Sequence, residues 1–192
     1  MNWETLLCIG DSITYGARSY AGYPEYAGRE LEKRLSKQWN VINESVSGFT
    51  TIDLCRQLSG NYSNLKGQAP SIITIMTGTN DVKLGIDVDK YAMAYSQLIT
   101  KAKIITKNVV LLKLPHFSKG VMYPYTFEMN SNIDAYNIEV EQLAKKHSVR
   151  CHEFDFKDSF FFDGVHLNEE GSESIALQLA NLILSDKGVF CD

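Results

Sequence analysis

The sequence predicts an α/β fold, a three-layer α/β/α domain built on a five-stranded parallel sheet. Two observations predict it. Short apolar runs alternate with longer segments of helical periodicity from one end of the chain to the other. Most of the apolar runs are β-branched or leucine-rich and do not alternate with polar residues, which is typical of parallel strands covered on both faces. Right-handed crossovers then place helices on both faces of the sheet.

The elements follow in order along the chain. The predicted strands cover residues 5–9, 40–43, 71–76, 108–114 and 149–154. The segments between and after them carry apolar residues at helical spacing. They are 26–38 (Leu31, Leu35), 91–106 (Tyr95, Leu98, Ile99, Ala102, Ile105), 132–147 (Ile133, Tyr136, Val140, Leu143, Ala144) and 169–185 (Ile175, Leu179, Leu182, Ile183), with a shorter helix at 51–58.

Composition suits one globular domain. The chain has 192 residues, of which 44% are hydrophobic, and it contains no Pro/Gly/Ser-rich linker and no internal repeat, so we expect a single domain over residues 1–192. The net charge is -4 and no block of like charge occurs. This argues against a nucleic-acid partner, because binding to a nucleic-acid backbone needs clustered Lys and Arg. The oligomeric state is left open.

The cysteine pattern and the first apolar run bear on location. Four cysteines lie far apart without a CxxC or Cys/His cluster, which argues against a zinc site and favours a reduced, cytoplasmic protein. We expect no membrane span and see no signal peptide, because the run at residues 6–9 is far too short for either. A chain trimmed of its leader would look the same.

Polar and glycine-bearing motifs follow four of the five predicted strands. Ser12 comes after the first strand, Gly48 after the second and Asn80 after the third, and Asp163 and His166 come after the fifth. In open parallel sheets, ligands bind at the carboxyl ends of the strands, where such loops meet. We therefore expect these five residues to lie together at one edge of the sheet.

Ser12, His166 and Asp163 are the residue types of nucleophilic catalysis. A serine hydroxyl is a weak nucleophile until a base takes its proton, and we predict that His166 is this base and later the general acid. Asp163, with Gly164 favouring a turn between them, would fix the imidazole tautomer and stabilise the imidazolium. Taken alone, residues 10–12 are explained as well by an ordinary turn, and His166 by a surface histidine near a helix start. The combination of these motifs favours catalysis.

Gly48 and Asn80 are candidate donors to a developing oxyanion. A glycine lets a backbone N–H approach a ligand without a Cβ in the way, and an asparagine side chain supplies an N–H donor. The transition state of acyl transfer needs such preorganised donors. Taken singly, a turn glycine at Gly48 and an Asx turn of Asn80 with Asp81 explain the two residues equally well.

Asp11 and Asp81 are further carboxylates beside these motifs. A metal site would use them with Asp163, but no further ligand appears at helical or turn spacing, and aspartates in such loops more often cap helices. We expect no metal. Because GxGxxG and Walker A patterns are absent, we also expect no cofactor. Asp11, next to Ser12, is a candidate substrate contact.

With these motifs in place, the sequence resembles the SGNH hydrolase superfamily, also called GDSL-type esterases and lipases. The match follows the family's order over nearly the whole chain, at Gly10-Asp11-Ser12, Gly48, Gly78-Thr79-Asn80-Asp81 and Asp163-Gly164-Val165-His166. The resemblance implies a flavodoxin-like fold and a catalytic triad of Ser12, His166 and Asp163. It also implies an oxyanion hole made by the backbone N–H groups of Ser12 and Gly48 and the side chain of Asn80.

The resemblance leaves the substrate open, since the family includes carbohydrate esterases such as acetylxylan esterases, lysophospholipases, thioesterases, arylesterases and acetylhydrolases. The short chain leaves little room for a lid, which favours a small-molecule ester, acetyl above all, with an acylated sugar as one candidate. The loop at 115–125 is rich in aromatics and lies at the same sheet edge. We expect Tyr123 and Tyr125 to form part of the substrate wall, although aromatics that cover the core explain the pattern equally well.

Other functions remain open at this point. A lysophospholipase or a thioesterase would use the same residues, as would an acyltransferase in which a sugar hydroxyl replaces water. A non-enzymatic, flavodoxin-like module that binds flavin or phosphate is disfavoured, because no phosphate-cradling loop follows the first strand.

Overall fold

The computed structural model describes residues 3–186 and contains a five-stranded sheet whose strands all run parallel, in the order β2-β1-β3-β4-β5. The strands are β1 (Glu4–Gly10), β2 (Trp39–Asn43), β3 (Ile72–Met76), β4 (Val109–Leu112) and β5 (Arg150–His152). The helices are α1 (Ser12–Tyr15), α2 (Tyr23–Leu35), α3 (Thr51–Gly67), α4 (Thr79–Lys83), α5 (Val88–Ile105), α6 (Asn130–His147) and α7 (Glu169–Asp186), with short 3₁₀ helices η1 (Phe127–Met129) and η2 (Asp158–Phe160). The predicted α/β class with a five-stranded parallel sheet is confirmed.

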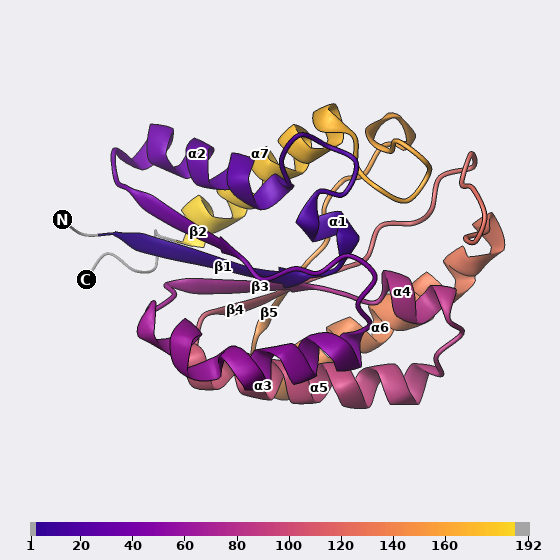
Figure 1. Cartoon of the computed structure of the whole chain (residues 1–192), viewed down its shortest axis with the longest axis horizontal. Helices are drawn as coiled ribbons and strands as arrows, with labels where there is room; N and C mark the ends of the chain where they lie inside the picture. The colour runs from indigo at the N-terminus through magenta and orange to yellow at the C-terminus, as the bar shows by residue number, and fades with distance from the viewer. Residues whose placement is uncertain (1–2, 187–192) are drawn as a thin grey trace.

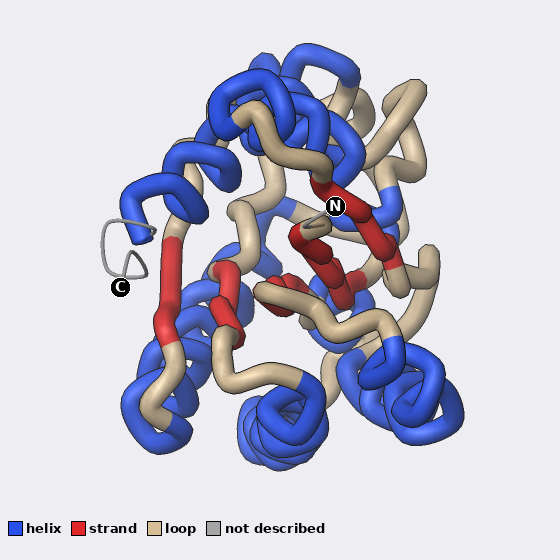
Figure 2. Tube along the Cα trace, turned by 90° about the vertical axis from the view of Figure 1, so that its left-hand side faces the viewer, coloured by secondary structure: helices blue, strands red, loops and turns tan. Residues whose placement is uncertain are grey.

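Helices cover both faces of the sheet. Helices α2 and α7 pack against each other on one face, and α3, α5 and α6 form the layer on the other (Figure 1). A view turned by 90° shows the strands between these two helical layers (Figure 2). Within residues 3–186, no helix combines the length and the hydropathy that a membrane crossing requires.

The three central strands carry the core. Strands β3 and β4 are buried along their whole length, and β1 is buried from Thr5 onward. The edge strands β2 and β5 are half-buried over most of theirs. The continuous apolar sequence of β3 and β4 is what a strand covered on both faces requires.

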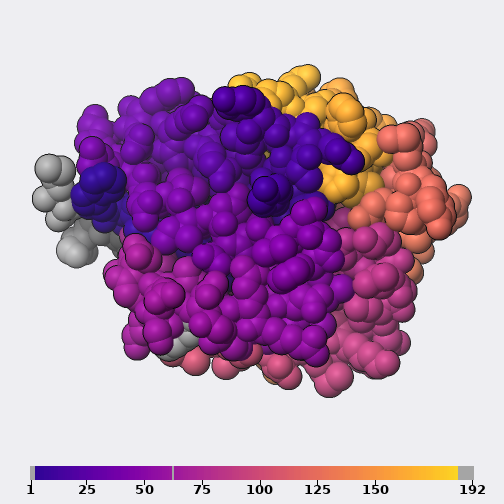
Figure 3. Space-filling model, viewed as in Figure 1, coloured from indigo at the N-terminus to yellow at the C-terminus, as the bar shows by residue number. Residues whose placement is uncertain are grey.

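The register of the sheet positions the loops that follow β1 and β3. Gly10 at the end of β1 lies opposite Met76 at the end of β3, so the chain leaves both strands at the same level before it enters α1 and α4. The loops after the strands gather at the right-hand end of Figure 1. In the space-filling view, the loop after β4 stands at this end beside the loop after β5 (Figure 3).

Several elements differ in length from the predictions. Helix α2 begins at Tyr23 because Pro24 suits a first helical turn, and it ends at Leu35 because Ser36 takes a left-handed conformation at φ 50°. Helix α3 continues to Gly67, and Leu65, which is only 3% exposed, gives its added turns a contact with the core. The short helices α1 and α4 were not predicted, because four or five residues are too few to show periodicity.

Candidate active site

Ser12 is the first residue of α1, directly after β1. Its side chain is buried at 2% exposure. Asp11 holds the turn, because one of its carboxylate oxygens accepts the N–H of Ile13 at 3.1 Å. The first N–H groups of a helix have no acceptor within the helix. The backbone N–H of Ser12, at the start of α1, is therefore a donor that can bind a ligand oxygen.

His166 and Asp163 lie in a small loop that is closed at its base. The N–H of Phe162 donates to the carbonyl of His166 at 2.8 Å, and Phe161 pairs with Leu167 in an antiparallel bridge. Gly164 adopts φ +84°, and a Cβ there would lie 2.4 Å from the Cα of Val121. Only glycine fits this position, so the loop after β4 and the histidine loop touch at backbone level.

The three predicted triad side chains form one chain of contacts. His166 Nε2 lies 2.9 Å from Ser12 Oγ, and His166 Nδ1 lies 2.8 Å from Asp163 Oδ2. An ionised carboxylate only accepts hydrogen bonds, so Nδ1 carries the proton and Nε2 is left to accept from the serine hydroxyl. The arrangement therefore presents a hydroxyl to a base whose tautomer is fixed by a carboxylate.

Asp163 is held as an anion by the loop itself. Its Oδ1 accepts the N–H of Val165 at 3.1 Å and the N–H of His166 at 2.9 Å. Burial alone would raise the pKa of Asp163, but the hydrogen bonds from His166 and Val165 outweigh it, so this pKa lies below its ordinary value. The carboxylate is ionised throughout the neutral range and stabilises a positive charge on the imidazole.

Asn80 is the second residue of α4 and is 1% exposed. Its Nδ2 donates to the carbonyl of Phe49 at 2.9 Å, and its Oδ1 accepts from Lys83 Nζ at 3.0 Å. These contacts do not support the Asx-turn alternative, because Asn80 Oδ1 accepts from the Lys83 side chain and the Asp81 carboxylate accepts from Thr51.

Gly48 lies in the loop between β2 and α3, next to Phe49. It adopts φ +85° within a turn, and a Cβ built there would have no heavy atom within 4 Å. Glycine is thus favoured by the backbone conformation, as in the turn-glycine alternative, and the space beside it is open. The hydrogen bond from Asn80 to Phe49 ties this loop to α4.

The position of Asp11 does not support the substrate contact that we expected for it. It is fully buried at 0% exposure, and its second carboxylate oxygen accepts the N–H of Thr79 at 3.3 Å. Burial raises the pKa of Asp11, and hydrogen bonds from Ile13 and Thr79 oppose this rise. Asp11 is a structural link between α1 and α4, as the helix-cap alternative implied.

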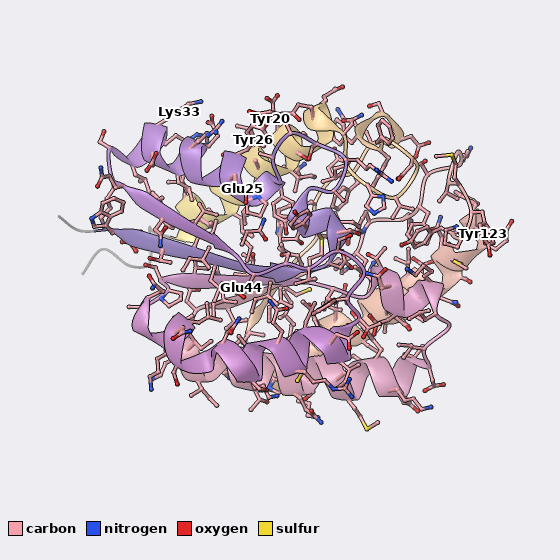
Figure 4. All side chains as sticks on the ribbon, viewed as in Figure 1. Tyr20, Glu25, Tyr26, Lys33, Glu44 and Tyr123 are labelled. Carbon is pink, nitrogen blue, oxygen red and sulfur yellow. The ribbon has the colours of Figure 1, made fainter. Side chains whose placement is uncertain are left out.

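The two tyrosines of the 115–125 loop lie in different environments. Tyr123 is 94% exposed and projects from the right-hand end of the molecule (Figure 4). Tyr125 is half-buried, its ring edge packs on Phe117 at 5.1 Å between centroids, and Lys83 Nζ lies 5.7 Å from its ring centre. Burial, with the nearby charges of Asp11 and Asp163, raises the pKa of Tyr125 to about 12. Of the pair, Tyr125 is the one beside the candidate site.

Sequence reasoning missed two charged residues at this site. Arg18 Nε lies 3.6 Å from Asp163 Oδ2, and its guanidinium lies 6.0 Å from the Phe162 ring centre. Arg18 is 55% exposed, so this ion pair contributes little to stability. Lys83 contacts Asn80 as described above. The 79–83 segment is too short to show helical periodicity, so the sequence did not predict a helix there. A predicted helix would have placed Lys83 at i, i+3 from Asn80 and so indicated their contact.

Asp81 gives the fold a pH-dependent stability that one substitution should remove. Burial raises the pKa of Asp81 to about 6 from 3.8, despite hydrogen bonds from Thr51. Between these values the folded protein binds more protons than the unfolded chain, so the free energy of unfolding falls as the pH rises, by up to about 3 kcal/mol. In Asp81→Asn this contribution to the pH dependence of the unfolding free energy is expected to vanish.

Thermal denaturation of both proteins between about pH 4 and pH 7 checks this expectation, because the variant keeps a neutral acceptor for Thr51. The difference in unfolding free energy between variant and wild type should grow with pH. A difference that does not change over this range would contradict it.

A hydroxyl, an imidazole and a carboxylate in contact at the carboxyl edge of a parallel sheet have the geometry expected of a serine hydrolase. The chain belongs to the GDSL-like lipase/acylhydrolase family, whose sequence profile matches residues 8–173. This confirms the resemblance inferred from the sequence, and family membership indicates a hydrolase of acyl esters.

Solved structures of similar fold include esterases. Axe2, an acetylxylan esterase from Geobacillus stearothermophilus, is 23% identical with a TM-score of 0.69, over 93% of this chain and 92% of that one. A lipase/acylhydrolase from Enterococcus faecalis is 20% identical with a TM-score of 0.76, over 94% and 95%. The acetyl xylan esterase AlAXEase is 19% identical with a TM-score of 0.77, over 93% and 99%. At these identities the similarity shows the fold. No curated protein sequence matches this chain significantly.

Proposed function

We propose that this protein is a serine esterase that hydrolyses small O-acyl esters, acetyl esters above all, through an acyl-enzyme on Ser12. The observation that carries the proposal is the contact chain from Ser12 Oγ through the imidazole of His166 to the carboxylate of Asp163. Each member has the partner that its role requires.

The reaction follows from this geometry in two halves. Ser12 Oγ attacks the ester carbonyl while His166 Nε2 takes its proton, and the imidazolium then protonates the departing alcohol. Water then attacks the acyl-serine while His166 Nε2 takes a proton from it, and the imidazolium returns this proton to Ser12 Oγ as the carboxylic acid leaves. Asp163 stays ionised throughout and stabilises the imidazolium.

The proposed oxyanion hole combines three donors. These are the backbone N–H groups of Ser12 and Gly48 and the one N–H of the Asn80 side chain that does not bond to Phe49. The hydrogen bond from Asn80 to the Phe49 carbonyl links α4 to the loop that carries Gly48, which supports an oxyanion hole with donors from both segments.

For the substrate we propose an acetyl ester of a sugar. Two proteins of similar fold are named as acetylxylan esterases, and in Axe2 one serine-to-alanine variant is described as a catalytic mutant. Hydrolysis of p-nitrophenyl acetate, butyrate and octanoate, together with acetylated xylo-oligosaccharides, tests the proposal. We expect kcat/KM to fall as the acyl chain lengthens and the sugar acetate to be cleaved. Absence of hydrolysis of every ester, or a preference for octanoate, would refute it.

Tyr125 is proposed to line the substrate site. Replacing it with alanine removes a half-buried ring that packs on Phe117 and lies 5.7 Å from Lys83 Nζ, and it is expected to raise KM several-fold across esters. Tyr123→Ala is the matched control, because that ring is exposed and two residues away in the same loop. Steady-state kinetics on several esters measure both. An unchanged KM in Tyr125→Ala would remove Tyr125 from the substrate wall.

A further inference from the structure

The side-chain amide of Asn80 is fixed at both of its ends. Its Nδ2 donates to the carbonyl of Phe49 at 2.9 Å, and its Oδ1 accepts from the Lys83 ammonium at 3.0 Å. An asparagine amide offers two N–H donors and one carbonyl. One N–H is engaged by Phe49 and the carbonyl is engaged by Lys83, so a single N–H remains for a ligand.

The two contacts select one orientation of the amide. If it were flipped, Oδ1 would face the carbonyl oxygen of Phe49 and the NH₂ group would face the Lys83 ammonium, so two hydrogen bonds would become two repulsive contacts. Asn80 is 1% exposed, so water does not readily replace either partner.

Lys83 is itself held in place. It lies on α4 at i, i+3 from Asn80, is half-buried, and lies 5.7 Å from the centre of the Tyr125 ring. A cation over an aromatic face is attracted to it. Among the ion pairs found within residues 3–186, none joins Lys83 to a carboxylate, so the neighbours of the ammonium are the amide oxygen and the ring.

We propose that Lys83 is a positioning residue for the oxyanion hole, acting through Asn80. It fixes the amide so that the remaining N–H is presented to the developing oxyanion, and its charge polarises the amide carbonyl, which makes that N–H a stronger donor. This inference rests on the proposed function.

Lys83 is expected to stabilise the transition state more than the bound substrate. Negative charge on the substrate oxygen is small in the bound ester and large in the tetrahedral intermediate, so a stronger donor lowers the barrier more than it tightens binding. Removing an oxyanion donor outright typically costs about 10²- to 10³-fold in kcat. Removing only the group that orients and polarises it should cost less, about tenfold.

Two substitutions test this inference. Lys83→Met keeps the length of the side chain and removes the ammonium, and it is expected to lower kcat about tenfold with KM changed less than twofold. Lys83→Arg keeps a cationic donor and is expected to retain most of the wild-type kcat. Lys90→Met, at an exposed lysine of α5, is the matched control and should behave as wild type.

A second readout separates positioning from general damage to the fold. Methylboronic acid forms a tetrahedral, anionic adduct with a reactive serine, whereas acetate binds as a planar product. In Lys83→Met the affinity for the boronate should fall in parallel with kcat, whereas the inhibition constant of acetate should stay at its wild-type value. If the methionine variant does not fold, Lys83→Leu, which likewise removes the ammonium and offers no donor to Asn80, gives the same comparison.

The inference is overturned by a wild-type kcat in the neutral variant, by a change confined to KM, or by an arginine variant as impaired as the methionine one. These outcomes are distinct from failure of the proposed function, which would show as an absence of Ser12-dependent ester hydrolysis in the wild-type protein.

Discussion

Replacing Ser12 with alanine is expected to lower kcat for p-nitrophenyl acetate by about 10⁴- to 10⁶-fold, the range seen when a nucleophilic serine is removed from a triad. Ser12 Oγ is the atom that forms the acyl-enzyme, and His166 Nε2 lies 2.9 Å from it, ready to take its proton. Without the hydroxyl, what remains is attack by water in a site that still offers oxyanion donors.

Ser45→Ala is the matched control for this loss. Ser45 is another buried serine after a strand of the same sheet, and its hydroxyl is one of the buried side-chain polar groups within residues 3–186 for which no hydrogen-bond partner is found. Steady-state kinetics and circular dichroism on all three proteins separate chemistry from folding. A Ser12→Ala protein that folds and retains a tenth of the wild-type activity would exclude Ser12 as nucleophile.

The second large effect is expected for Asp163→Asn, which should lower kcat about 10⁴-fold. Two backbone N–H groups donate to Asp163 Oδ1, so in the variant the amide oxygen must occupy that position. The amide NH₂ then faces His166 Nδ1 and forces the imidazole to accept there. The proton moves to Nε2, which points at Ser12 and no longer accepts from it.

This prediction concerns orientation, so the variant should fold and bind substrate normally. We expect KM within a few-fold of wild type. Asp158→Asn, at an exposed aspartate of the preceding 3₁₀ helix η2, should be fully active. A loss of less than tenfold in Asp163→Asn would show that the tautomer of His166 is set by another group.

The sequence was sufficient to predict the fold because the hydrophobic pattern of the strands matches their burial in the parallel sheet. The apolar runs of β3 and β4 are continuous where the structure buries both faces of the strands. Since parallel strands end at one edge, the motifs after them could be expected to meet, and the contacts among Ser12, His166 and Asp163 follow that expectation.

What the sequence could not give depends on burial and on short elements. Asp11 and Asp163 are both aspartates beside a catalytic-type residue, yet Asp11 is a buried link between helices and Asp163 faces His166. Helix α4 spans only Thr79–Lys83, so the i, i+3 contact between Lys83 and Asn80 had no periodic signal. Arg18 and Asp163 lie near opposite ends of the sequence, so their ion pair could not be predicted from local sequence patterns.

Modification by a fluorophosphonate, followed by peptide mass spectrometry, tests most directly whether Ser12 is the activated nucleophile. Such reagents phosphonylate a serine whose hydroxyl is deprotonated by a neighbouring base. We expect a single adduct on the peptide that contains Ser12, formed in step with the loss of esterase activity. An adduct on another residue with the same time course, or full loss of activity with Ser12 unmodified, would contradict the proposed mechanism.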